Sequence, residues 1–182
     1  MPRKNRIWYP ELIYHVTARG NRKESIFREE NDYKMYLHCI EEAVNYYSDK
    51  YKIISYCLMT NHVHLQVKTE DIHIGRLIGR INFIYAMSFN KKYDYIGHLF
   101  QGRYAAEIID NDKYLLQASK YIHLNPVRAK LVTKPEDYRW SSYNMYIGEE
   151  EENIISSDML LSHFKNNNDN SRRAYKDFME AK

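Results

Sequence analysis

Two histidines separated by one residue are the strongest chemical signal in the chain. His62 and His64 lie in a segment whose β-branched and apolar residues are typical of a strand. Because side chains alternate across a strand, both histidines share a face with Gln66, while Val63 and Leu65 take the other. Two neighbouring imidazoles can bind one metal ion, although a hydrogen-bonded strand histidine is the commoner outcome. The pair alone therefore does not establish a metal site.

A helix predicted farther along the chain carries residues that could complete such a site. Its polar stripe, at spacings of three and four, consists of Tyr114, Gln117, Tyr121 and Asn125. If this stripe meets the sheet face that carries the histidines, Asn125 can add an amide oxygen to the metal, with Tyr121 one turn away. The alternative is an ordinary amphipathic helix whose tyrosines pack their rings and expose their hydroxyls.

The elements that must position these residues follow the order of a split β-α-β, ferredoxin-like antiparallel sheet, which is an α+β fold. Hydrophobic periodicity predicts strands over residues 12–17, 51–58, 62–68 and 104–109, and helices over residues 31–48, 72–92 and 110–124. The last helix is additional to the ferredoxin-like core. It is predicted to end at Leu124, because Pro126 disfavours helical geometry at Asn125.

The C-terminal part of the sequence is more polar and acidic than the rest, and only short helices are predicted in it. A short helical piece after Pro135, with Trp140 and Tyr143, is expected to dock on the body. Beyond it, the acidic run 149–152 and the polar stretch 166–170 are typical of solvated linkers around a short helix at 159–164. We therefore predict one domain over residues 1–147, followed by a polar, acidic tail over residues 148–182.

Charge and composition argue against a disulfide-rich protein, a thiolate metal site and a membrane-spanning protein. The net charge is +3, with 22 Lys and Arg against 16 Asp and Glu up to residue 148 and 5 against 8 after it, an excess too small to indicate nucleic acid by itself. Eighteen tyrosines are more suggestive, since unpaired bases stack on aromatic rings. The two cysteines indicate neither a disulfide framework nor a thiolate metal site. No apolar run approaches 18 residues, so we expect no membrane span and a cytoplasmic location.

Five segments, in order and spacing, resemble the signatures of single-tyrosine HUH transposases, and most of all those of the REP-associated tyrosine transposases. Starting at Tyr14, Leu58, Gly97, Tyr121 and Tyr138, they read YHVTARGN, LMTNHVHL, GHLFQGRY, YIHLNPVRA and YRWSSY. The resemblance covers about residues 6–147, and residues 148–182 match no family that we can name.

The resemblance implies a metal-dependent single-stranded DNA endonuclease and strand transferase that acts on hairpin or palindromic DNA at the bacterial nucleoid. It implies that His62 and His64 are metal ligands, that Asn125 is the polar ligand, and that Tyr121 is the nucleophile that forms a 5′-phosphotyrosine. The metal implied is Mg²⁺ or Mn²⁺, although imidazole ligands also suit zinc, which would compete. A tyrosine phenol titrates at about 10, so a bound cation that withdraws charge from the scissile phosphate would assist the attack.

Contacts with DNA are expected from arginines within or beside the matched segments, namely Arg19, Arg22, Arg103 and Arg128. Each of them could instead form a surface ion pair. His15, His98 and His123 are interpreted as structural or substrate-side groups, and Trp140 and Tyr143 as packing residues.

Several alternatives stay open at this stage. The chain could be a binding module for structured single strands that has lost catalysis, or a metal-dependent phosphodiesterase that uses water in place of Tyr121. The biological role could be that of a mobile element or of a resident enzyme. The protein could be a monomer or a homodimer, and we favour a site completed within one chain.

Overall fold

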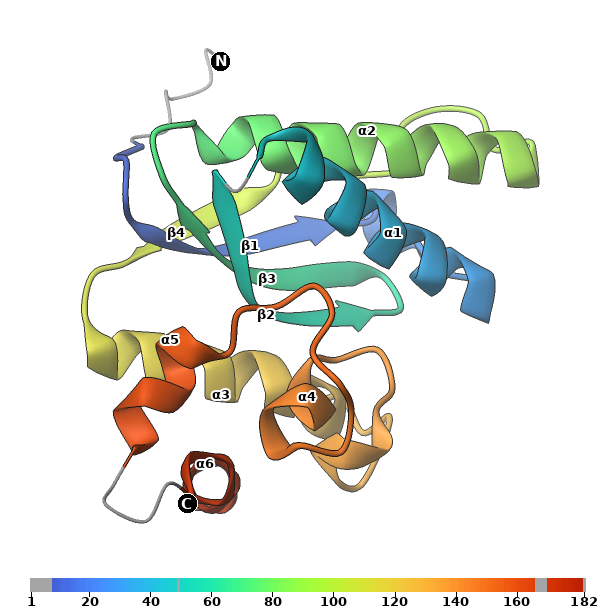
Figure 1. Ribbon diagram of the computed structural model, residues 1–182. Helices are drawn as coiled ribbons and strands as arrows, with labels where there is room; N and C mark the ends of the chain where they lie inside the picture. Colours follow the sequence, from blue (N-terminus) through green and yellow to red (C-terminus); the bar gives the residue numbers. More distant parts are fainter. Residues whose placement is uncertain (1–7, 49, 166–169, 182) are drawn as a thin grey trace.

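Four antiparallel strands form one sheet with the order β2-β3-β1-β4 in this computed structural model, which describes residues 8–48, 50–165 and 170–181 (Figure 1). The strands are β1 (Ile13–Arg19), β2 (Tyr51–Met59), β3 (His62–Thr69) and β4 (Ala105–Ile109). This is the strand order of a ferredoxin-like sheet, so the predicted α+β fold is confirmed.

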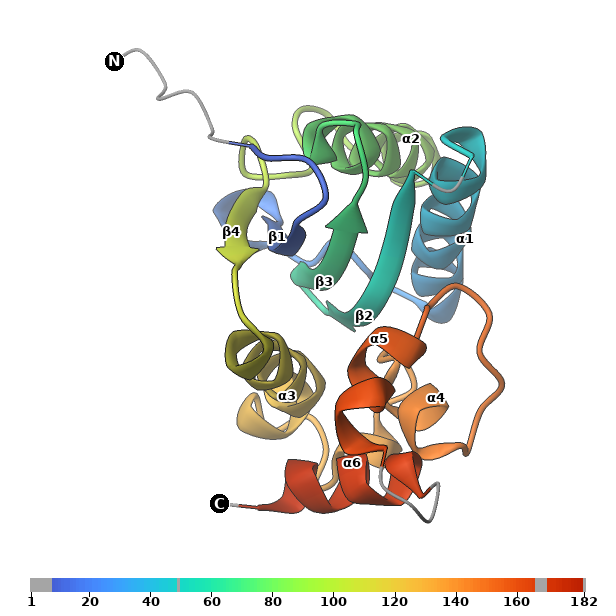
Figure 2. The same ribbon diagram turned by 60° about the vertical axis from the view of Figure 1, so that its left-hand side comes forward.

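Two helices cover one face of the sheet, and a third lies on the opposite face (Figures 1 and 2). The first two are α1 (Glu30–Tyr46) and α2 (Ile74–Tyr93), and the third is α3 (Asp112–Arg128). Strand alternation explains this division. Val63, Leu65 and Val67 are fully buried in the main hydrophobic core, whereas Gln66 donates a 2.9 Å hydrogen bond to the carbonyl of Leu115 on α3.

Helix α3 differs from the sequence prediction at its end. It begins as expected, since the side chain of Asn111 accepts a 2.8 Å hydrogen bond from the backbone N–H of Tyr114. It does not end at Leu124, however, but continues through the buried Pro126 to Arg128. Tertiary packing overrides the local preference, because burial of Ile122 and Pro126 on one face favours a continuous helix. Asn125 therefore lies one true helical turn after Tyr121.

The C-terminal part of the chain is more structured than the sequence indicates. It contains η2 (Pro135–Asp137), α4 (Tyr143–Ile147), α5 (Asp158–Leu161), η3 (Ser162–Phe164) and α6 (Ser171–Glu180), while a further 3₁₀ turn, η1 (Asn21–Lys23), follows β1. The short helix near 159–164 is present, and α6 was not expected.

Side chains from this region join the main core rather than standing apart from it. Leu160, Tyr175 and Met179 are almost completely buried in the same hydrophobic cluster as the strands. The division at residue 147 stays a prediction, and the predicted linker at 166–170 lies, except for Asn170, outside the described residues.

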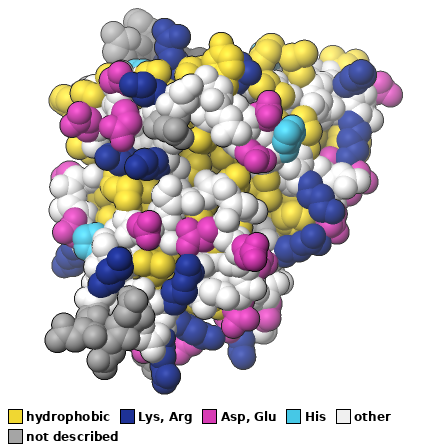
Figure 3. Space-filling view, in the orientation of Figure 1, with side chains coloured by type: hydrophobic (Ala, Val, Ile, Leu, Met, Phe, Trp, Pro, Cys, Tyr) yellow, Lys and Arg dark blue, Asp and Glu magenta, His cyan; other side chains and the backbone are white. Residues whose placement is uncertain are grey.

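The surface shows no extended region of a single charge on the face seen in Figure 3, where Lys and Arg are interspersed with Asp and Glu. Both cysteines, Cys39 and Cys57, are buried as free thiols. No helix in the described part of the chain is long and apolar enough to cross a membrane.

Candidate active site

The predicted site residues of β3 and α3 meet where α3 crosses the sheet. Asn125 Nδ2 lies 3.2 Å from His64 Nε2, and the ring centroids of His62 and His64 are 4.9 Å apart. The Tyr121 ring lies 5.5 Å from the His64 ring and 5.9 Å from the His15 ring, centroid to centroid. The structure therefore brings His62, His64, Tyr121 and Asn125 together within a single chain.

Each of the two histidines is held through its Nδ1 atom. His62 Nδ1 lies 2.6 Å from the side-chain oxygen of Asn61, which makes Nδ1 the donor and leaves Nε2 with a free lone pair. Burial, helped by the positive charge of Arg19, lowers the pKa of His62 to about 4. The ring is therefore neutral near pH 7, as a metal ligand must be.

His64 is more deeply enclosed and only 5% exposed. Its Nδ1 lies 3.0 Å from His15 Nε2 and 3.2 Å from Thr17 Oγ1, so Nε2 is the atom turned toward Asn125. Burial, followed by the neighbouring His62 and His15, lowers the pKa of His64 to about 3. This ring is neutral too.

Three residues around the histidines were not assigned to the site by the sequence analysis. The sequence pattern gives no role to Asn61 or Thr17, and it indicates only a structural or substrate-side group at His15. A pattern could have found two of them, because His15 and Thr17 alternate on β1 as the histidines alternate on β3. Their Cα partners across the ladder are Gln66 and His64.

Tyr121 is accessible from solvent, with 41% of the residue exposed. Its helix is anchored by the buried Leu115, Ala118 and Ile122, which fall on the opposite stripe of α3. The guanidinium carbon of Arg128 lies 5.0 Å from the centre of the Tyr121 ring, within the range of a cation–π contact. An exposed tyrosine beside a cation is accessible to an incoming phosphate.

The four predicted DNA-binding arginines are not all gathered at this point. Arg128 lies over Tyr121, and Arg19 is opposite His62 in the β1–β3 ladder. Arg103 lines a groove beside α2, and Arg22 is exposed in η1 with a φ of 53°. Within the described part of the chain, none of the four forms an ion pair with a carboxylate.

The fold places the chain among the α+β proteins that share the fold of the Y1 transposases. The family model described as "Transposase IS200 like" matches residues 9–125. The chain belongs to this family.

One solved structure supports the fold, and a second is reported only as a similar protein. A REP-associated tyrosine transposase bound to a REP hairpin is similar with a TM-score of 0.66 and 19% identity, over 86% of this chain and 91% of that chain. A putative transposase from Deinococcus radiodurans has a TM-score of 0.45 and 16% identity, over 66% of this chain and 95% of that one. A comparison with curated proteins found no match.

Proposed function

We propose that this transposase is a metal-dependent endonuclease and strand transferase for hairpin or palindromic single-stranded DNA, with Tyr121 as its nucleophile. His62, His64 and Asn125 would hold the metal. The observation that carries the proposal is the convergence of Asn125 Nδ2 on His64 Nε2 at 3.2 Å, with the exposed Tyr121 one turn earlier on the same helix.

The donor set fits a divalent cation with open positions. In the described residues no three His, Cys, Asp or Glu side chains cluster as a metal site, so the third protein ligand would be an amide. Rotating the Asn125 amide by 180° places its oxygen where the nitrogen now lies, because the two ends of the amide have nearly the same shape. Two imidazole nitrogens and one amide oxygen leave room for water and a phosphate oxygen, as a catalytic site requires.

When bound, Mg²⁺ or Mn²⁺ would withdraw charge from the scissile phosphate and orient it. The Tyr121 oxygen forms a bond to phosphorus while the bond from phosphorus to the 3′ oxygen breaks, which gives a 5′-phosphotyrosine and a free 3′-hydroxyl. The phenolic proton passes to the departing 3′ oxygen or to solvent. Attack by another 3′-hydroxyl on the same phosphorus reverses the step and joins strands without an external energy source.

The arrangement supports catalysis by one chain and contact with DNA on both sides of the tyrosine. Since all four candidate residues come from the same chain, a second copy is not needed to complete the site, which suits either a monomer or a homodimer. Arg19 and Arg128 flank it and are available for phosphate oxygens, because neither is engaged by a carboxylate within the described residues.

The test is formation of a covalent protein–DNA band on a denaturing gel after incubation with a pool of hairpin-bearing single strands and Mn²⁺. The wild type should give the band only with metal, and Tyr121→Phe should lose it by a factor of at least about 10³, since no other oxygen stands in that place. Tyr114→Phe is the matched control. Its hydroxyl lies two turns away on the same helix and contacts Glu107 at 2.9 Å, so the band should be retained.

Two other results would contradict the proposal in different ways. Cleavage that survives in Tyr121→Phe would indicate water as the nucleophile and a phosphodiesterase. DNA binding by the wild type without any covalent band or cleavage would indicate a binding module that has lost catalysis.

A further inference from the structure

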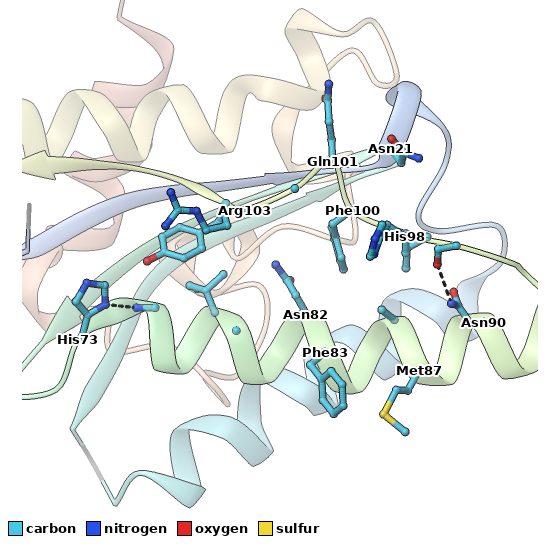
Figure 4. Close-up of a pocket in the computed structure, with 18 residues that line it drawn as sticks. Asn21, His73, Asn82, Phe83, Met87, Asn90, His98, Phe100, Gln101 and Arg103 are labelled. Atoms are coloured by element: carbon cyan, nitrogen blue, oxygen red, sulfur yellow. Dashed lines mark hydrogen bonds between the residues drawn. The ribbon is translucent and has the colours of Figure 1, made fainter. Parts of the chain in front are cut away.

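A groove of about 1160 Å³ lies between α2 and the loop that precedes β4, away from the face of the sheet that carries the histidines (Figure 4). On the helix side Asn82 points toward the loop, whereas Phe83 and Met87 project from α2 away from the loop and form the outer rim of the groove. The loop side supplies His98, Phe100 and Arg103. This groove has no part in the chemistry proposed for Tyr121.

The polar groups of the groove suit the edges of unpaired bases. Asn82 accepts a 2.9 Å hydrogen bond from the hydroxyl of Tyr36, which fixes its amide and leaves the NH₂ toward the groove without a partner among the described residues. Base edges offer ring-nitrogen and carbonyl acceptors to such a donor. An amide held in place by a buried tyrosine is a preformed hydrogen-bonding group.

Two large apolar side chains at the rim are exposed to solvent. Phe83 is 65% exposed and Met87 is 58% exposed. Aromatic rings beside a basic residue are the platform on which proteins stack the bases of single strands. Among the described residues that line the groove none is Asp or Glu, whereas Arg103 is present, so the charge suits a polyanion.

The groove is connected to the candidate active site through the end of β1. The backbone N–H of Gln101 donates a 2.8 Å hydrogen bond to the carbonyl of Arg19, and Arg19 is the ladder partner of His62. The N–H of Asn21 likewise donates to the carbonyl of Leu99 at 2.8 Å. A strand that leaves the histidines past Arg19 would meet the loop wall of the groove next.

We propose that this groove binds unpaired bases of the single-stranded DNA substrate, on the stretch that continues from the cleavage site around the end of β1. The proposal rests on the proposed function only in taking single-stranded DNA as the substrate. Asn82 donates to a base edge, Phe83 offers a stacking surface and Arg103 contacts the backbone.

Gly79 provides a means of filling the groove without disturbing the core. It lines the groove on α2, and a Cβ built there meets no atom within 4 Å. Gly79→Trp therefore places an indole in the groove, and Gly79→Ala is the matched control that leaves it open. Phe83→Ala removes the exposed rim aromatic, and Leu131→Ala, at a residue that is 50% exposed and lies outside the groove, is its control.

The experiment measures binding of a fluorescent random 20-nucleotide single strand by anisotropy, without added metal so that no cleavage intervenes. Gly79→Trp and Phe83→Ala should each raise Kd about tenfold relative to their controls, which is what the loss of one stacked base costs. Thermal unfolding verifies that each variant is folded. A Kd within twofold of the control in both variants would overturn the proposal, as would the absence of binding by the wild type.

Photocrosslinking separates this proposal from the one for Tyr121. With bromouracil in the same strand, adducts are expected on residues 82–104 of the wild type, and their confinement to β3 and α3 would overturn the groove. Loss of the covalent phosphotyrosine band with groove adducts retained would instead count only against the proposed chemistry.

Discussion

Each imidazole of the candidate site is fixed by the group on the far side of its ring. Asn61 accepts from His62 Nδ1 at 2.6 Å, and His15 and Thr17 contact His64 Nδ1. A partner of this kind selects the tautomer and the ring orientation and raises the basicity of the nitrogen that faces the metal. The two proposed metal ligands can be named from their sequence pattern, but the orientation of their rings depends on contacts that the pattern does not show.

Replacing Asn61 separates this effect from simple damage to the turn. Asn61→Ala removes the acceptor and should weaken Mn²⁺ binding by about 10- to 100-fold, whereas Asn61→Asp keeps an acceptor and should retain most of the affinity. Both variants lose the 3.0 Å bond from the Asn61 amide to the carbonyl of Lys23, so the loss of that bond does not account for a difference between them. Titration calorimetry would measure it, and equal affinities for the two variants would contradict this role of Asn61.

Among the elements, α2 shows two glycines in contrasting environments. Gly79→Ala should raise the free energy of unfolding by about 0.5–1 kcal/mol, because alanine restricts the unfolded chain and nothing in the fold opposes its Cβ. At Gly75 the Cβ would come within 2.9 Å of His73 Nδ1, which accepts the capping bond from Gly75 N at 2.8 Å. Gly75→Ala should lower stability. Urea unfolding of both variants tests this, and a gain at Gly75 would refute it.

The sequence predicted whether a segment is a helix or a strand wherever its hydrophobic periodicity is strong. The stripes of α1 and α2 and the alternation in β3 gave the correct elements, since each buries one side of a regular structure. The end of α3 was predicted wrongly because the preference of Pro126 is local and the packing that overrules it is not. Helix α6 was not expected because it is short and polar and depends on burial of Tyr175 and Met179 against distant elements.

In the candidate site, too, residues that belong to a sequence pattern could be predicted, whereas contacts between side chains could not. The candidate residues His62, His64, Tyr121 and Asn125 could be named in advance because they occur in recognisable segments. The Asn61, His15 and Thr17 contacts needed coordinates, since each depends on the ring orientation of a histidine. The groove beside α2 joins a helix to a loop with no pattern in common, so no periodicity could have revealed it.

In the molecule as a whole, α6 and the sheet hold the tyrosine helix between them. His123, two residues after Tyr121, is fully buried, and its Nδ1 and Nε2 lie 2.7 Å from Tyr175 Oη on α6 and 2.8 Å from Ser142 Oγ. Burial lowers the pKa of His123 to about 3, so the ring is neutral near pH 7. Lys120 adds a 2.8 Å bond to the carbonyl of Phe178. The segment after residue 147 therefore supports the element that carries the candidate nucleophile.

Removing one hydroxyl group should weaken the support that α6 gives to α3. Tyr175→Phe removes a hydroxyl that bonds His123 Nδ1 and, at 3.2 Å, Ser119 Oγ, and leaves the histidine nitrogen buried without its partner. We expect a loss of about 1–3 kcal/mol in the free energy of unfolding. Tyr143→Phe is the control, because Tyr143 is equally buried and its hydroxyl has no hydrogen-bond partner within the described residues.

Urea unfolding should therefore separate the two variants although both remove one hydroxyl from a buried ring. If α6 fixes α3 as the contacts indicate, hydrogen exchange of the amides around Tyr121 should also quicken in Tyr175→Phe and stay unchanged in Tyr143→Phe, since local opening follows the weakest contacts of an element. Equal stabilities for both variants would mean that the polar network contributes no more than the packing around it. The C-terminal helix would then act on α3 only through apolar burial.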